Sequence, residues 1–222
     1  MSIVVLAKVS KDYFLGQMRV AALKHIDLSV EQGEFLALAG PSGSGKTTAL
    51  NLIGCIDTPS EGSVFIDGQQ TSSLSSDELA DIRAEKLSFI FQNFNLLPVL
   101  SALENVEYPL LNKKNLKKNK KELARQALES VGLSRFAHHK PLELSGGQQQ
   151  RVAIARAIVC EPLIVLADEP TANLDHATGE EILQLMKQIN QERKTTFIFS
   201  THDQMVMDKA HRIVRLFDGA LV

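Results

Sequence analysis

The sequence predicts an α/β fold with a mainly parallel sheet, an antiparallel β part near the N-terminus and an inserted helical part. The first observation is a set of apolar runs that are nearly continuous and that each stop at a polar residue. Such runs are typical of strands buried on both faces of a parallel sheet. They are Glu34–Gly40, Pro162–Glu169 and Thr195–Asp203.

The second observation is that segments with helical spacing alternate with these runs, which indicates an α/β arrangement. Because ligands of open α/β sheets gather at the carboxyl ends of strands, we expect a site near Gly40, Asp168 and His202. The expected helices are Thr47–Ile56, Gln148–Val159 and Ala177–Gln191.

The remaining segments differ from this pattern. The first thirty residues and "GSVFIDGQQ" predict short antiparallel strands, with turns at "EQGE" and "IDGQ". From about Phe94 to Ala153 the pattern is mostly helical, with "ALENVEYPLL" and "KKELARQALESVGL" as helix candidates. We therefore expect one domain over residues 1–222, with an α/β core in about 1–92 and 154–222 and a helical subdomain in about 93–153.

Composition limits the class of protein. With 222 residues, 44% of them hydrophobic and 23% charged, the chain is long enough for one globular domain with a substantial core. Its net charge of -2 provides no basic field, so we expect no nucleic acid partner. Only two cysteines occur, Cys55 and Cys160, which fits a reducing compartment and favours two buried free thiols.

Neither end of the chain suggests membrane insertion or export. No apolar run reaches the roughly 18–20 residues that span a bilayer, and the start lacks a basic segment and a cleavage site. The chain ends directly after the last expected strand, so we expect a stand-alone subunit. Six lysines crowd into Lys113–Lys121. A solvated loop with a first helical turn is the favoured interpretation, and contact with anionic lipid headgroups is the alternative.

A glycine-rich stretch, "GPSGSGKT" (Gly40–Thr47), matches G-x-x-x-x-G-K-[ST] between an expected strand and an expected helix, the context of a phosphate-binding loop. Glycines let backbone N–H groups surround phosphates, and the helix N-terminus favours anions. Lys46 supplies a cation for the β- and γ-phosphates, and the Thr47 hydroxyl can ligate Mg²⁺. The expected nucleotide-binding residues are Gly40, Pro41, Ser42, Gly43, Ser44, Gly45, Lys46, Thr47 and Thr48.

Two acidic residues supply the second half of such a site. Asp168, at the end of a buried strand, can hold Mg²⁺ through water, and Glu169 is placed to polarise an attacking water. The alternative is a solvated acidic strand end, but the phosphate loop in the same chain favours a catalytic role for these two residues. Together these motifs predict a P-loop NTPase core that binds a nucleotide with Mg²⁺, but they do not say which kind of NTPase it is.

A second glycine-containing helix start follows in "LSGGQQQ", where Ser145, Gly146, Gly147 and Gln148 lead into an expected helix. One nucleotide does not need two such anion-binding ends from one subunit. A simple resolution is a head-to-tail pair, in which these residues of one copy close over the ATP held by Lys46 of the other.

The order of the motifs resembles that of an ABC-transporter ATP-binding subunit over essentially the whole chain. The matching motifs are the phosphate loop, "FQ" at Phe91–Gln92, "LSGGQ", "LADEP", "NLD" at Asn173–Asp175 and "STHD". The resemblance implies that Tyr13 stacks on adenine, with Phe14 as a possible substitute. It also implies that Gln92 contacts Mg²⁺ and the attacking water and senses a membrane partner, that Asp175 communicates between the two sites, and that His202 grips the γ-phosphate. With Glu169 these form the expected catalytic set.

The stretch "FQNFNLLPVLSALENVEYPLL" resembles the macrolide-export (MacB-like) and lipoprotein-releasing (LolD-like) ATPases. That resemblance implies a homodimer on the cytoplasmic side of the bacterial inner membrane. It also implies a permease with few transmembrane helices and a large periplasmic domain. Within the stretch, the apolar residues between Phe94 and Val99 could line a groove for a partner helix or belong to the subdomain core. Two alternatives stay open: a regulatory ATPase like the cell-division protein FtsE, and a soluble ABC ATPase of DNA repair or translation.

Overall fold

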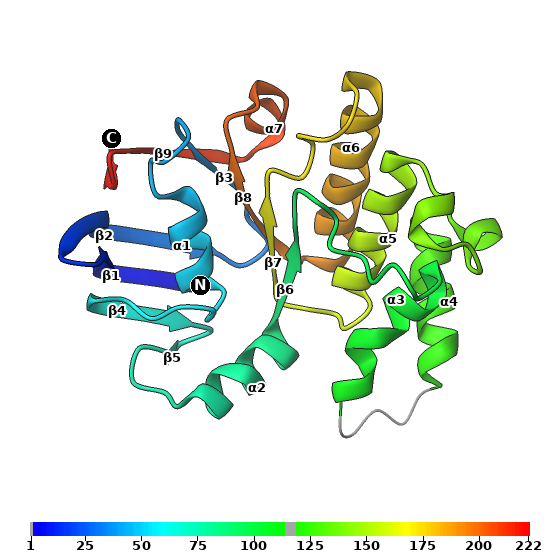
Figure 1. The fold of residues 1–222 in the computed structure, drawn as a ribbon, viewed down its shortest axis with the longest axis horizontal. Helices are drawn as coiled ribbons and strands as arrows, with labels where there is room; N and C mark the ends of the chain where they lie inside the picture. The colour runs from blue at the N-terminus through cyan, green and yellow to red at the C-terminus, as the bar shows by residue number, and fades with distance from the viewer. Residues whose placement is uncertain (1, 114–118) are drawn as a thin grey trace.

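The computed structural model describes residues 2–113 and 119–222, which form two sheets with helices between and beside them (Figure 1). The first sheet is antiparallel and has the strand order β2-β1-β4-β5. The second has the order β10-β9-β3-β8-β7-β6. The predicted α/β class, with an antiparallel part and a mainly parallel sheet, is confirmed.

The antiparallel sheet is built on one long hairpin. Strands β1 (Ser2–Leu15) and β2 (Met18–Glu31) have 14 residues each, and β4 (Glu61–Ile66) pairs with the other side of β1. The prediction of short strands was wrong here, because register shifts along β1 interrupt the alternation of apolar and polar residues that the sequence pattern uses. The short strand β5 (Gln69–Gln70) forms the edge.

The central sheet contains the three predicted buried strands, β3 (Phe35–Ala39), β7 (Ile164–Asp168) and β8 (Thr196–Thr201). They pair in parallel, and their carboxyl ends lie at one edge. The flanking strands β6 (Leu87–Ile90) and β9 (Arg212–Phe217) are also parallel to their neighbours, and β10 (Ala220–Leu221) is antiparallel to β9.

Alternate residues of these strands enter two separate cores. In β3, Phe35 packs with the helices α3, α4, α5 and α6, whereas Leu36 and Leu38 pack with α1, α2 and the antiparallel sheet. Helix α1 thus lies between the two sheets, and the other helical layer covers the opposite face of the central sheet (Figure 1). The α-helices are α1 (Lys46–Ile53), α2 (Ser76–Lys86), α3 (Ala102–Glu107), α4 (Lys120–Ser130), α5 (Gly146–Ile158), α6 (His176–Arg193) and α7 (Gln204–Lys209).

Several predicted boundaries change. The helix expected over "ALENVEYPLL" ends as α3 at Glu107 and continues as a 3₁₀ turn, Tyr108–Asn112, because Pro109 lacks the N–H that an α-helix needs. Two more 3₁₀ turns, Ser134–Phe136 and Pro141–Glu143, precede α5. Helix α1 ends at Ile53, three residues before the expected end, since Gly54 and the positive φ of Cys55 (54°) turn the chain away.

The structure does not reproduce, or does not cover, some of the other predicted features. The boundary expected near residue 153 falls inside α5, so the division into subdomains stays a proposal. Cys55 is buried as predicted, but Cys160 is only partly buried. Residues 114–118 of the lysine run lie outside the described residues. Within the described ranges, no helix combines the length and apolarity that crossing a membrane requires.

Candidate nucleotide-binding site

The phosphate-binding loop depends on glycine backbone geometry. Gly43 and Gly45 have φ values of 79° and 105°, which L side chains rarely adopt. A Cβ at Gly45 would also lie 2.5 Å from the carbonyl oxygen of Ala22. Gly45 is the N-cap of α1, and no side chain accepts a hydrogen bond from the helix N-terminus. The first N–H groups of α1 are therefore available to an anion.

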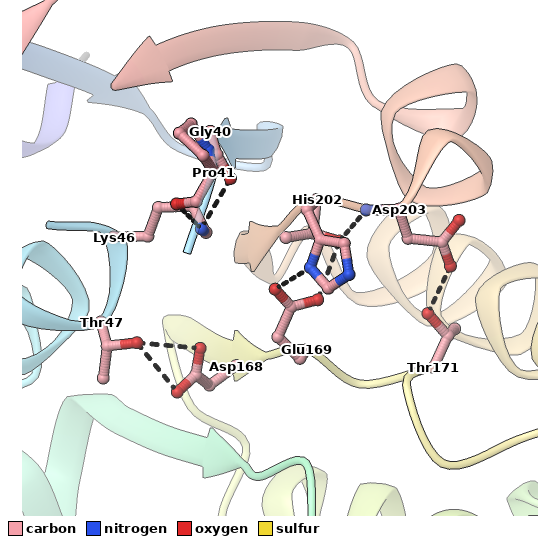
Figure 2. Close-up of polar contacts among 10 residues, drawn as sticks. Gly40, Pro41, Lys46, Thr47, Asp168, Glu169, Thr171, His202 and Asp203 are labelled. Atoms are coloured by element: carbon pink, nitrogen blue, oxygen red, sulfur yellow. Dashed lines mark hydrogen bonds and ion pairs between the residues drawn. The ribbon is translucent and has the colours of Figure 1, made fainter. Parts of the chain in front are cut away.

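Lys46 lies within this loop. Its Nζ donates hydrogen bonds to the carbonyl oxygens of Gly40 (2.7 Å) and Pro41 (2.9 Å), as Figure 2 shows. Only 6% of the residue is exposed. The loop backbone thus holds the ammonium group next to the helix end, where its charge adds to the attraction for phosphate.

Two of the three expected magnesium ligands, Thr47 and Asp168, meet across the site. Thr47 Oγ1 lies 3.4 Å from Oδ1 and 3.3 Å from Oδ2 of Asp168, although 121 residues separate them in sequence (Figure 2). A hydroxyl and a carboxylate are hard oxygen donors of the kind Mg²⁺ prefers, so this pair fits the metal. Thr47 and Asp168 would hold Mg²⁺ here, and the ion would supply positive charge for the phosphates.

Glu169 directly follows β7 and is held by three contacts. Its backbone, in the left-handed region (φ 46°), donates from N–H to the carbonyl of Ser200. Its Oε1 lies 2.7 Å from Nδ1 of His202, and its Oε2 accepts a hydrogen bond from Thr201 Oγ1 at 3.3 Å. Because an ionised carboxylate only accepts, Nδ1 of His202 carries the hydrogen of this bond. Glu169 and His202 therefore form one unit beside Asp168 (Figure 2), suited to general-base work.

A single cavity of about 420 Å³ brings most predicted residues together. Val20, Ala21 and Ala22 of β2, together with Ser200, also line it and were not predicted. Small or apolar side chains of this kind do not indicate a nucleotide site in a sequence, and only the fold places β2 beside the loop. The predicted residues in the lining are Ser42, Gly43, Gly45, Lys46, Thr47, Thr48, Gln92, Asp168, Glu169 and His202.

The segment around Gln92 is tied to two other elements. Arg156 of α5 donates to the carbonyl oxygens of Phe94 (2.6 Å) and Asn95 (2.5 Å), both of which have positive φ. Burial lowers the pKa of the Arg156 guanidinium. Asn173 donates through Nδ2 to the carbonyl of Gln92 at 2.9 Å. Any displacement of the Gln92 segment must therefore act on α5 and on the loop after β7.

Other predicted residues lie outside the cavity lining. Gly40, Pro41 and Ser44 form the loop behind it. Tyr13 of β1 is 37% exposed, and its hydroxyl donates to Asp57. Asp175 is the N-cap of α6, where it accepts hydrogen bonds from the backbone and hydroxyl of Thr178. These bonds hold the pKa of Asp175 below its usual value, the hydroxyl having the larger effect.

The predicted signature residues form the start of α5. The Ser145 hydroxyl accepts from the backbone N–H of Gln148, and the Gln148 side chain accepts from the backbone N–H of Ser145. This reciprocal arrangement is a capping box. Gly146 and Gly147 occupy the first helical turn, and a Cβ at Gly147 would lie 2.5 Å from Thr178 Cγ2.

A parallel sheet that ends at a glycine-rich loop, with a lysine, a threonine and an aspartate converging there, defines the class of P-loop NTPases. The family is narrower: the ABC transporter profile matches residues 23–172, and the chain belongs to this family. The chain is an ATPase that binds ATP with Mg²⁺.

Individual relatives agree with this assignment. The uncharacterised ABC transporter ATP-binding protein MJ0796 of Methanocaldococcus jannaschii is 50% identical over 218 residues, 96% of this chain and 93% of the relative. A macrolide export ATP-binding/permease protein MacB of Syntrophobacter fumaroxidans is 46% identical over 223 residues. That match covers 100% of this chain but 31% of the relative.

A solved structure is similar over almost the whole chain. It is the dimeric structure of a post-hydrolysis state of the MJ0796 cassette bound to ADP and Pi, with a TM-score of 0.91 and 49% identity. The similarity covers 98% of this chain and 96% of that one.

Proposed function

We propose that two copies of this chain bind ATP between them head to tail and that their closure drives a membrane permease of the MacB/LolD type. The main support is the position of the α5 start. The described residues that line the cavity include none from 145–148, although this helix start has the features of an anion site. A second copy can bring it to the nucleotide, and twofold symmetry then makes two equivalent composite sites.

The site residues have distinct roles in this scheme. Lys46 and the start of α1 hold the phosphates, Thr47, Asp168 and Gln92 hold Mg²⁺, and Glu169 with His202 acts on the attacking water. Ser145 to Gln148 of the other copy complete the site, and Asp175 connects the two sites. The dimeric structure of the similar MJ0796 cassette supports this arrangement.

The proposed permease contact lies on the segment after Gln92. Leu96 packs against the helical core, whereas Leu97 (38%) and Val99 (75%) are exposed. An exposed apolar group beside the nucleotide-sensing segment suits a helix of a partner protein. We place the subunit on the cytoplasmic side of the inner membrane, against a permease with few transmembrane helices and a large periplasmic domain. The MacB relatives, named as ATP-binding/permease proteins, support a membrane partner.

The names of the curated relatives favour transport over the regulatory alternative, since they are transporter ATP-binding or macrolide export proteins. Nothing in the site favours the DNA-repair or translation alternative.

The Glu169→Gln variant tests the proposal. We expect it to bind ATP, to hydrolyse it at least about 100-fold more slowly and to accumulate as a dimer, because the nucleotide that closes the dimer is no longer consumed. Light scattering with and without MgATP measures the dimer, and phosphate release measures turnover. A monomer at saturating MgATP, in a variant that still binds ATP, would contradict the head-to-tail site. Co-purification with a candidate permease, reduced by Val99→Asp, tests the membrane partner separately.

A further inference from the structure

The register of the β1–β2 hairpin distinguishes Tyr13 from Phe14. Tyr13 pairs across the hairpin with Val20, which lines the nucleotide cavity. Phe14 pairs with Arg19 instead, and Arg19 forms an ion pair at 2.7 Å with Asp12. Because successive residues of a strand alternate between its faces, Tyr13, whose hydroxyl reaches Asp57 just beyond α1, lies on the α1 side of the hairpin and Phe14 lies on the other side.

The Tyr13 ring is held at both its edge and one face. Its hydroxyl donates to Asp57 Oδ2 at 2.8 Å. The other carboxylate oxygen of Asp57 accepts from Lys11 Nζ at 2.6 Å, and this ammonium group lies over the Tyr13 ring, 5.0 Å from its centroid. Lys11 covers one face of the ring, so only the opposite face can receive another planar group.

The same contacts connect the ring to the phosphate-binding helix. Asp57 follows α1 by four residues, and its backbone N–H donates to the carbonyl of Asn51 within that helix. Burial raises the pKa of Asp57, but hydrogen bonds from Lys11, Tyr13 and the Thr58 N–H outweigh it, and the pKa lies below its usual value. The carboxylate is therefore charged at neutral pH and can accept from both side chains.

We propose that Lys11 and Asp57 are positioning residues that fix the Tyr13 ring as the platform on which the adenine of ATP stacks. The inference rests on the proposed role of Tyr13 in the nucleotide site. Asp57 sets the distance between ring and phosphate loop through α1, and Lys11 leaves one ring face open for the base. A cation on the far face also withdraws π-electron density, which reduces repulsion between the two stacked rings.

The test separates binding of the base from binding of the phosphates. Asp57→Asn and Tyr13→Phe each disturb the contact that orients the ring but leave the ring in place. We expect both to weaken MgATP binding about three- to tenfold, the range set by one stacking contact. Binding of magnesium triphosphate, which has no base, should stay unchanged in both variants, and kcat of Asp57→Asn at saturating ATP should stay within about twofold. The double variant should be no weaker than either single variant.

Asp12→Asn is the matched control, because Asp12 lies on the same strand and forms an ion pair on the opposite face. It should bind MgATP like the unmodified chain. An equal loss in Asp12→Asn, or a parallel loss of ATP and triphosphate binding in Asp57→Asn, would show a general structural effect and overturn the inference.

The Tyr13→Ala variant shows whether a negative result contradicts the positioning role of Asp57 or the stacking role of Tyr13 itself. If Tyr13→Ala weakens ATP binding and Asp57→Asn does not, the platform role stands and the positioning role is wrong. If Tyr13→Ala leaves ATP binding unchanged, the proposed platform itself is wrong. Tyr13→Phe removes only one hydroxyl from a partly exposed residue, so it keeps the test usable if another variant fails to fold.

Discussion

The two helix starts that the proposed site uses, those of α1 and α5, are built in opposite ways. Gly45 caps α1 and leaves its first N–H groups without a side-chain acceptor. Ser145 and Gln148 close the start of α5 with a capping box. The donors at the α1 start are therefore left for solvent or a ligand, whereas the α5 start is partly satisfied within its own chain. This difference suits one end that binds nucleotide alone and another that binds only when a second copy arrives.

The two starts nevertheless share one electrostatic property. Among the seven α-helices of the described residues, only α1 and α5 have no carboxylate at the N-cap or in the first turn. The capping boxes of α2 and α3 use Glu78 and Glu104, but that of α5 uses the neutral Gln148. The positive ends of these two helix dipoles are thus left for an external anion. The other carboxylates are Glu122 in α4, Asp175 before α6 and Asp203 before α7.

The largest expected difference is between Lys46→Ala and Ser145→Ala. Lys46→Ala should weaken ATP binding about 10- to 100-fold, because a charged hydrogen-bond donor to phosphate is lost. Ser145→Ala should leave ATP binding by the single chain within about twofold but abolish ATP-dependent dimerisation and hydrolysis. Nucleotide titration and phosphate release measure the two effects.

Mixing the two inactive variants sharpens this comparison. A mixed dimer contains one site with an intact Lys46 from one copy and an intact Ser145 from the other, so part of the hydrolysis should return. Each variant alone is the control. No recovery in a mixture shown to form mixed dimers would mean that each chain uses its own α5 start.

The next largest effect concerns stability. Gly45→Ala should cost about 2–4 kcal/mol, because the new Cβ occupies a positive-φ position and overlaps the Ala22 carbonyl. Gly146→Ala should change the free energy of unfolding by less than about 1 kcal/mol, since its nearest neighbour would be Leu174 at an ordinary 3.5 Å. Urea unfolding of both variants measures the difference. Equal costs would show that both glycines serve the fold in the same way.

A smaller effect is expected from charge alone. Gln148→Glu keeps the capping box but places a negative charge at the start of α5, so we expect ATP-dependent dimerisation to weaken about three- to tenfold. Glu104→Gln makes the reverse change in the capping box of α3 and is the matched control. Dimerisation should not respond to it. If Gln148→Glu dimerised normally, the charge at this helix start would have no role in binding.

The smallest expected effect concerns α6, whose N-terminus is capped by the carboxylate of Asp175. Asp175 caps α6, and its lowered pKa means that the carboxylate adds stability above its unfolded pKa of about 3.9 and loses it as pH falls through the folded value. Asn can accept the same bonds but does not titrate. The stability difference between the unmodified chain and Asp175→Asn should be present at pH 7 and shrink as the pH falls below 4. A difference independent of pH would contradict the ionised cap.

The parts of the fold with strong periodicity could be predicted from the sequence. The runs that became β3, β7 and β8 are mostly apolar, because nearly all of their residues are buried on one or the other face of the sheet. Helix α2 was missed because only Leu79 and Ile82 are buried in it, although the Ser75–Glu78 capping box was a readable signal. Strand β6 has four residues, too few for a period, and only its parallel pairing with β7 defines it.

The candidate site likewise has one part that could be predicted from the sequence and one part that could not. The proposed phosphate and metal ligands could be predicted from a local motif at Lys46 and Thr47 and from the end of a buried strand at Asp168. The contacts that hold the neighbouring segments in place could not be predicted in this way. Asp57 beside Tyr13 and Arg156 beside Phe94 join segments 44 and 62 residues apart, and no local pattern reports such pairs.

The left-handed backbone at Glu169 sets the proposed role of this residue in hydrolysis against the folding energy of the chain. Gly or Asn would adopt this conformation at a lower cost than glutamate, which loses of order 1 kcal/mol there. Glu169→Gly should therefore unfold at a higher temperature than Glu169→Gln, while neither variant hydrolyses ATP at the normal rate. A melting comparison of the two would show how much stability this chain gives up to keep a carboxylate at the end of β7.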